Sequence, residues 1–314
     1  MFQRLVVALD GSLRAEQAVP VAARLARASG GSVLLVQVVN PPIDYSGGMA
    51  LVSPLAGETV EQEMAEATAY LNTVAASPMF AGIEGKVNVS FGPAARDILA
   101  AAEAYESDLI VLCSHGRTGF LRWALGSVAH KLIHTSAIPV LVLRQDEEAS
   151  SHFSNLGTRP LCALVPLDGS PLAEEVLVAA AHLTAALAAP AQGALHLVQV
   201  VKFVPTEMGE GYSSELNEEA LQRARNYLAS IADRLQATMK ELKLALPYAA
   251  ELDVDAASVL VSLAEQKGAD AYDLIAISTH GRGGLESWVM GSVTERLLNT
   301  TKLPMLIVRP PQEG

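Results

Sequence analysis

The sequence predicts two tandem α/β domains, each a doubly wound unit in which helices cover both faces of a five-stranded parallel β-sheet. Three observations carry this prediction: a domain-length internal repeat, short apolar strands that alternate with helical patterns, and strands without polar alternation. Strands that are apolar throughout are buried on both faces. Alternating β and α segments provide that burial when the helices flank a parallel sheet.

The repeat is clearest around the fourth strand of each copy. Residues 108–132 read DLIVLCSHGRTGFLRWALGSVAHKL, and residues 273–297 read DLIAISTHGRGGLESWVMGSVTERL. Each copy also opens on an apolar strand that runs into Asp-Gly-Ser, at Asp10 and at Asp168, and closes on a proline-led strand. A repeat of this length indicates duplication of a whole folding unit.

Copy one is expected to span 1–145 and copy two 160–310, because the polar segment 146–159 between them carries a glycine and has no usable period. The first helix of each copy is expected to begin at Ser12 or Ser170, residue types that suit an N-cap. Five strands are expected in each copy, near 4–9, 33–39, 86–91, 108–113 and 139–143, and near 161–167, 194–201, 247–252, 273–278 and 304–308.

Composition predicts a cytosolic protein. The net charge of −12, without a Lys/Arg-rich run, disfavours nucleic acid and anionic membranes as partners. The two cysteines, Cys113 and Cys162, are expected to be reduced. The apolar segment before Asp10 is too short for a signal peptide. The alanine-rich segment 176–191 is interpreted as a helix packed on the sheet, because it is shorter than the roughly 18 residues that a bilayer requires.

The loops that follow the fourth strands are the strongest candidates for a binding site. In open parallel sheets, ligands bind beyond the carboxyl ends of the strands, where the strand order reverses. These loops, 114–127 and 279–292, are rich in glycine and end in Gly-Ser at the start of a helix. A helix N-terminus offers free amides and about half a positive charge to a phosphate. Ser127 and Ser292 could cap that helix or donate a hydroxyl to a phosphate oxygen.

Other nucleotide and hydrolase signatures are missing from the sequence. It contains no Walker A motif, no Gly-x-Ser-x-Gly elbow and no Gly-x-Gly-x-x-Gly turn after the first strand. The commonest P-loop, hydrolase and dinucleotide-binding classes are thereby excluded.

The loops resemble those of the universal stress protein family. ATP-binding members carry glycine, two residues, glycine, nine residues and then Gly-Ser or Gly-Thr after the fourth strand. The second half of this pattern fits both copies, at Gly116 with Gly126-Ser127 and at Gly281 with Gly291-Ser292. The first glycine falls instead on Cys113 and Ser278, so a backbone angle that favours glycine is not guaranteed there.

The resemblance implies a strand order of 3-2-1-4-5 and a bound ATP, with or without Mg²⁺. It implies that Asp10 and Asp168 hydrogen-bond the ribose and that the backbones of Val38 and Val200 meet adenine. The candidate ligand-binding residues are therefore Asp10, Val38, Cys113, His115, Gly116, Arg117, Gly119, Gly126, Ser127 and Val128 in copy one, and Asp168, Val200, Ser278, His280, Gly281, Arg282, Gly284, Gly291, Ser292 and Val293 in copy two.

Several of these residues have a simpler interpretation. Asp-Gly-Ser is also an ordinary turn sequence. For the histidines, bonding to nearby backbone is preferred over contact with phosphate. Arg117 and Arg282 suit either a phosphate or solvent. His130 and His134 are interpreted as part of a helix face, since no third metal ligand is evident. The acidic segment 252–255 after the third strand of copy two is expected to be a helix cap or a feature that weakens the second site.

Three functions remain open from the sequence. The leading hypothesis is a nucleotide-binding stress or regulatory protein that acts through a change of conformation or assembly. The alternatives are a slow ATPase, which lacks a clear general base, and a dimerisation scaffold that has lost nucleotide binding. Universal stress proteins are known for dimers that pair their last strands. We expect 139–143 and 304–308 to pair within the chain, with a homodimer as the alternative, because either strand would otherwise be an apolar edge.

Overall fold

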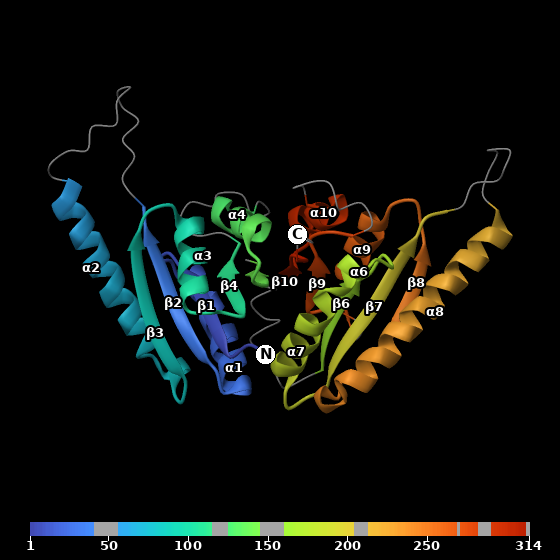
Figure 1. Cartoon of the computed structure of the whole chain (residues 1–314), viewed down its shortest axis with the longest axis horizontal. Helices are drawn as coiled ribbons and strands as arrows, with labels where there is room; N and C mark the ends of the chain where they lie inside the picture. The colour runs from blue at the N-terminus through green and yellow to red at the C-terminus, as the bar shows by residue number, and fades with distance from the viewer. Residues whose placement is uncertain are drawn as a thin grey trace, which may run out of the picture.

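A computed structural model of the chain describes residues 1–40, 56–114, 125–144, 160–203, 213–268, 271–281 and 290–311. The described residues form two α/β halves that lie side by side and share one continuous sheet (Figure 1). Each half repeats the same order of strands and helices, as the internal repeat predicts. The predicted linker lies outside the described residues.

All ten predicted strands are present, and their ends lie within two residues of the predicted bounds. In copy one they are β1 (Arg4–Leu9), β2 (Ser32–Val39), β3 (Glu84–Phe91), β4 (Leu109–Cys113) and β5 (Val140–Leu143). In copy two they are β6 (Leu161–Pro166), β7 (Gly193–Val201), β8 (Tyr248–Leu252), β9 (Leu274–Ser278) and β10 (Met305–Val308).

The strands are ordered β3-β2-β1-β4-β5-β10-β9-β6-β7-β8 across the sheet. Neighbouring strands within each half are parallel. The order 3-2-1-4-5 therefore occurs twice, as the resemblance implies. In each half the first strand lies between the second and the fourth, which is where the strand order reverses and where a ligand is expected.

Helices cover both faces of the sheet. One face carries α1 (Ala18–Ser29), α2 (Ala56–Ala75), α6 (Pro171–Glu174), α7 (Val176–Ala188) and α8 (Ser214–Thr238). The other face carries α3 (Ala94–Ala104), α4 (Ser127–Thr135), α9 (Ala256–Ala264) and α10 (Ser292–Thr300). Short 3₁₀ turns lie at η1 (Ala15–Gln17), η2 (Pro78–Phe80) and η3 (Lys240–Leu242). Each face buries one apolar cluster that draws residues from both copies, so the core is continuous across the molecule.

The last strands of the two copies join the halves. β5 and β10 pair antiparallel, with Met305 opposite Val142 and Ile307 opposite Val140. Every residue of the two strands is buried. The predicted pairing within the chain is confirmed, and it removes an apolar edge from each half.

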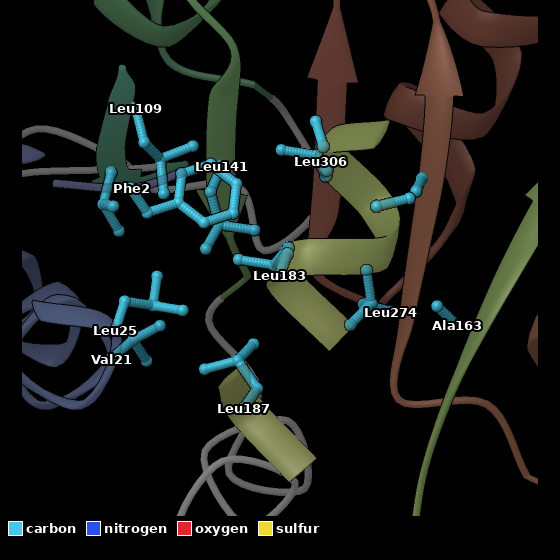
Figure 2. Close-up of a cluster of buried hydrophobic side chains, with 14 of the residues drawn as sticks. Phe2, Val21, Leu25, Leu109, Leu141, Ala163, Leu183, Leu187, Leu274 and Leu306 are labelled. Atoms are coloured by element: carbon cyan, nitrogen blue, oxygen red, sulfur yellow. The ribbon is translucent and has the colours of Figure 1, made fainter. Parts of the chain in front are cut away.

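Helix packing extends this seam on one face of the sheet. Figure 2 shows Val21 and Leu25 of α1 facing Leu183 and Leu187 of α7. Among the described residues, the stretch Pro171–Ala188 is long and apolar enough to cross a membrane, but 56% of it is buried inside the structure. Its high hydropathy follows from packing on two sides, against its own sheet and against α1. The interpretation as a helix packed on the sheet is confirmed.

Arginines from one copy bind helix ends of the other. Arg144, which follows β5, donates to the carbonyl oxygen of Leu298 in the last turn of α10. Arg309, which follows β10, donates to the carbonyl oxygen of His134 in the last turn of α4, at 3.0 Å. Arg24 likewise donates to carbonyl oxygens at the end of α7. The partial negative charge of a helix C-terminus favours these cations, so the contacts add polar links to the apolar seam.

Candidate functional site

The first loop of the site is an Asx turn that is the same in both copies. Oδ1 of Asp10 accepts hydrogen bonds from the Ser12 amide at 3.0 Å and from its hydroxyl at 2.6 Å. Oδ1 of Asp168 accepts from the Ser170 amide at 2.9 Å and from its hydroxyl at 2.6 Å. The turn interpretation of Asp-Gly-Ser is thus confirmed for one carboxylate oxygen. The bonds hold the carboxylate at the carboxyl end of the first strand.

The two serines then lead into helices in different ways. Ser170 is the N-cap of α6, and its hydroxyl accepts from the Ala173 amide, as predicted. In copy one the Ser12 hydroxyl accepts from the Ala15 amide at 3.1 Å. A 3₁₀ turn follows there, and α1 itself begins at Ala18. The prediction that Ser12 caps the first α-helix is therefore wrong, because the chain completes a tighter turn before that helix starts.

Asp168 lies directly against the glycine-rich loop after β9. A Cβ atom on Gly281 would lie 2.1 Å from Oδ2 of Asp168, so a side chain at that position would clash with the carboxylate. A side chain at this position would force the Asp168 carboxylate to move, so close approach rather than backbone angle favours glycine here. Two motifs that are 113 residues apart in the sequence are thereby brought into contact.

The ends of the glycine-rich loop are held together in both copies. The Gly126 amide donates to the Ser114 carbonyl at 2.7 Å, and the Gly291 amide donates to the Thr279 carbonyl at 2.8 Å. Each loop therefore leaves and returns at the same point beyond the fourth strand.

The helices after these loops begin without a side-chain cap. Gly126 and Gly291 are the N-caps of α4 and α10, and neither helix has a side-chain cap hydrogen bond. Ser127 and Ser292 are exposed first helical residues, which excludes the cap as their role and leaves donation of the hydroxyl to a phosphate as the prediction. The side chains of the N-cap residues cap α6, α8 and α9, whereas α1, α3 and α7 also begin without such a cap. The side chain of the N-cap residue therefore does not occupy the first amides of α4 and α10, which are the amides that a helix start offers to an anion.

Cys113 and Ser278, which stand where the family pattern has glycine, have backbone angles that any residue can adopt. Both are buried, and neither is among the non-glycine residues with positive φ in the described part of the chain. The Cys113 thiol donates to the Ala15 carbonyl at 3.8 Å, and burial raises its pKa to about 12. The thiol is therefore protonated at neutral pH, which agrees with a packing role. Cys113 and Cys162 are both free cysteines.

The described histidines of the loops and of α4 contact side chains close to them in the sequence. Nδ1 of His280 lies 2.8 Å from the Thr279 hydroxyl, so its ring partner is a neighbouring side chain rather than the expected backbone group. The rings of His130 and His134 lie 4.3 Å apart on α4. No group of three metal-ligating side chains occurs among the described residues. His115, Gly116, Arg117 and Gly119, with Arg282 and Gly284, lie outside the described residues.

The predicted base-contacting valines lie at the carboxyl ends of the second strands. Val38 is in β2 and Val200 is in β7, and both are partly exposed. Val128 and Val293 are the second residues of α4 and α10 and pack on the apolar cluster of that face. The described candidates of each copy therefore follow the first, second and fourth strands, which are neighbours in the sheet.

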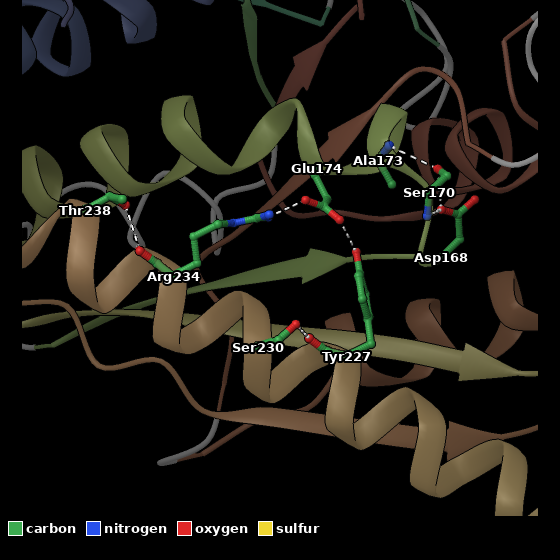
Figure 3. A network of polar contacts seen from close by, with 8 residues as sticks. All are labelled: Asp168, Ser170, Ala173, Glu174, Tyr227, Ser230, Arg234 and Thr238. Carbon is green, nitrogen blue, oxygen red and sulfur yellow. Dashed lines mark hydrogen bonds and ion pairs between the residues drawn. The ribbon is translucent and has the colours of Figure 1, made fainter.

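Two tyrosine–glutamate pairs beside the site were missed by sequence reasoning. The Tyr70 hydroxyl donates to Glu16 at 3.0 Å, and the Tyr227 hydroxyl donates to Glu174 at 2.9 Å. Burial, followed by the glutamate contact, raises the pKa of both tyrosines. Figure 3 shows the second pair beside the Asp168 turn, where Arg234 also reaches the glutamate. The sequence does hold a signal for these pairs, because a glutamate follows the site aspartate by six residues in both copies, at Glu16 and Glu174.

Sequence comparison agrees with this geometry. The model of the universal stress protein family matches residues 1–144 and 163–309. The chain belongs to the universal stress protein family. A universal stress protein of Mycolicibacterium smegmatis is 26% identical over 309 residues, which cover 98% of this chain and 97% of the relative. One of Mycobacterium tuberculosis is 28% identical over 316 residues, which cover 97% and 96%.

A solved structure that matches nearly the whole chain shows the same fold. A universal stress protein from Archaeoglobus fulgidus has a TM-score of 0.62 at 17% identity and covers 98% of this chain and 99% of its own. Another solved universal stress protein is a complex with cAMP. Its TM-score is 0.32 at 20% identity, over 46% of this chain and 98% of that one.

Proposed function

We propose that each copy of this universal stress protein binds one nucleotide, with ATP preferred over GTP and with or without Mg²⁺. The observation that carries the proposal is the contact of Asp168 with Gly281, beside the uncapped N-terminus of α10. A carboxylate that suits ribose hydroxyls thus lies next to amides that suit phosphate. The equivalent turn and helix start recur in copy one.

The placement of the candidates suits the length of a nucleotide. Adjacent strands are about 4.8 Å apart. Phosphates at the start of α4 lie beyond β4, and a ribose at Asp10 lies beyond the neighbouring β1. The base then falls beyond β2, where Val38 lies. The same sequence of strands in copy two is β9, β6 and β7.

Backbone amides also reconcile phosphate binding with the acidity of the chain. A net charge of −12 opposes a polyanion at long range. Helix N-termini attract phosphate locally, with a partial charge of about half a unit and with directed hydrogen bonds. A site built from main-chain groups therefore requires no cluster of lysines or arginines.

Binding and regulation fit the site better than catalysis. One oxygen of each site aspartate is engaged in its turn, and the pKa of about 12 keeps the Cys113 thiol protonated. The ring of His280 contacts Thr279. A general base aimed at the phosphate position does not emerge from these contacts. The two sites share one sheet, so a change of conformation or assembly is the proposed output, and two free cysteines suit a reducing compartment such as the cytosol.

Ligand extraction tests this proposal most directly. Purified protein is heated, and the released small molecules are identified by mass spectrometry. Calorimetric titration with ATP is expected to give a stoichiometry near two. A value near one would show that one copy has lost its site. No binding at millimolar ATP would favour the scaffold alternative, and steady turnover with Mg²⁺ would favour the ATPase.

A further inference from the structure

Two equivalent glutamines present a buried acceptor without a partner. Gln37 in β2 and Gln199 in β7 each directly precede the candidate valine of their copy. Among the residues that the structure describes, Oε1 of each is buried and has no hydrogen-bond partner. Gln199 as a whole is 7% exposed. Buried polar atoms are nearly always paired, so the same exception at the same position in both copies calls for a shared function.

The position of the glutamines ties them to the site. Gln37 pairs in register with Leu9, the last residue of β1 before Asp10. Its Nε2 lies 3.8 Å from the point that a Cβ on Gly11 would occupy, so the carboxamide lies beside the Asp10 turn. Gln199 directly follows Val198, which pairs with Pro166 at the end of β6, shortly before Asp168. Both carboxamides therefore lie at the carboxyl end of the second strand.

The strand order places the base of a nucleotide at this end. With phosphates beyond the fourth strand and the ribose at the first, the base lies beyond the second. We propose that the carboxamides of Gln37 and Gln199 read the base and that their oxygen accepts a hydrogen bond from the exocyclic amine of adenine. This inference rests on the proposed function, and it assigns the adenine preference to named side chains.

The chemistry of a carboxamide fits this role. The last torsion of a glutamine side chain is soft and roughly two-fold, so a half turn exchanges Oε1 with Nε2. For Gln37 that rotation places the acceptor where Nε2 now lies, beside the Asp10 turn. Adenine carries an amine donor at the position where guanine carries a carbonyl acceptor. After this rotation the oxygen faces the base, where the amine of adenine can donate to it and the carbonyl of guanine cannot.

Deletion of both partners tests the contact. The protein variant is Gln37→Met with Gln199→Met, which replaces the carboxamides by apolar side chains of similar length. The ligand variant is purine riboside triphosphate, which is ATP without the amine. Calorimetry should show that the unmutated protein binds ATP roughly tenfold more tightly than the analogue, the value of about one hydrogen bond. In the double variant the two ligands should bind equally.

Thr184→Val is the matched control. Thr184 is fully buried in α7, and its hydroxyl also lacks a hydrogen-bond partner among the described residues. The substitution removes an unpaired buried oxygen away from the site, so the tenfold preference should persist.

Equal binding of ATP and the analogue by the unmutated protein would overturn the inference while nucleotide binding itself stands. A preference that survives in the double variant would overturn it as well. Absence of binding of either ligand to the unmutated protein would refute the proposed function and this inference together.

Discussion

The glutamates beside the two aspartate turns have different surroundings. In copy one Glu16 accepts from Tyr70 of α2. In copy two Glu174 accepts from Tyr227 of α8 and also contacts Arg234, which lies two turns further along the same face of α8. Counting from the tyrosine, the position of Arg234 corresponds to Ser77 in copy one, beyond the end of α2. The longer α8 thus adds an ion pair to a link that both copies share.

The loops after the third strands also differ, because copy two again has side-chain contacts that copy one lacks. In copy one the N-cap of α3 is Pro93, which has no side-chain cap. In copy two the carboxylate of Asp255 caps α9 and contacts Arg296 of α10. Hydrogen bonds from Ser258 and then from Arg296 lower the pKa of Asp255 to about 2. The expectation that the acidic segment 252–255 forms a helix cap is confirmed.

The turns, loop closures and tyrosine–glutamate pairs are therefore retained in both copies, whereas the ion pairs and the cap added around them differ. The Asx turns need an aspartate carboxylate that accepts from the backbone, and the closed loops and helix starts need glycine, so few alternatives preserve them. Side-chain pairs around them are exposed to solvent on one side and contribute little individually, so they can change.

The largest effect is expected at the seam, which makes the two copies one body. Val142→Pro removes an amide from a central strand and should cost about 3 kcal/mol or more of the free energy of unfolding. After proteolysis within 146–159, native mass spectrometry should show that the halves separate. Val142→Ala, which keeps the amide, should leave them together. Free separation of the halves in the unmutated protein would contradict the seam.

A charge at the helix starts should distinguish the two sites. Gly126→Asp and Gly291→Asp each place a carboxylate where an anion would meet the first amides. Each should weaken one site by roughly 100-fold, since hydrogen bonds to charged groups contribute about 1.5–3 kcal/mol each. Calorimetric stoichiometry should fall from two to one, and the double variant should not bind.

The control for this experiment is Ser213→Asp, because α8 is already capped by the side chain of Ser213. Circular dichroism checks that all variants keep their fold. An undiminished affinity in the double variant would place the phosphate site elsewhere.

Removing the tyrosine hydroxyls should cost different amounts of stability in the two copies, because only Glu174 of copy two also has an ion pair. Tyr70→Phe removes the hydrogen bond to Glu16 and should cost about 1 kcal/mol of the free energy of unfolding. Tyr227→Phe should cost less, because Glu174 keeps its contact with Arg234. Urea unfolding of both variants measures the difference, and removal of Arg234 should make the costs equal. A larger loss for the second variant would refute this account.

The smallest effect is expected when the pH is lowered, which protonates His134 beside the seam and reduces the free energy of unfolding. Burial, and then His130, lower the pKa of His134 from its usual 6.5. The neutral ring therefore contributes stability above pH 6.5 that is lost as the pH falls, when the unfolded chain binds the proton more readily. Copy two has Asn299 at the position equivalent to His134. His134→Asn should reduce the stability lost between pH 7 and pH 5 by less than about 0.5 kcal/mol. Thermal melts at both pH values measure it, and an unchanged acid loss would exclude a contribution from His134.

Much of the site was predictable from local patterns. Repetition of Asp-Gly-Ser and of the Gly-Ser helix starts located both loops, because turns and helix starts are encoded over a few residues. Of the two roles open to Ser127 and Ser292, the cap is excluded because the glycine before each serine is the N-cap, and donation to a phosphate stays a prediction. Tyr70, Tyr227 and the glutamines were missed, since each matters through a neighbour that is distant in the sequence.

The sequence by itself determined the duplication, the ten strands and the loops at their carboxyl ends, because apolar periodicity and turn residues act over short distances. The tertiary structure decided that Asp168 lies against Gly281, that arginines bind helix ends across the seam, and that Gln37 lies beside the Asp10 turn. These contacts join segments far apart in the chain. Their existence depends on strand order and register, which no local pattern specifies.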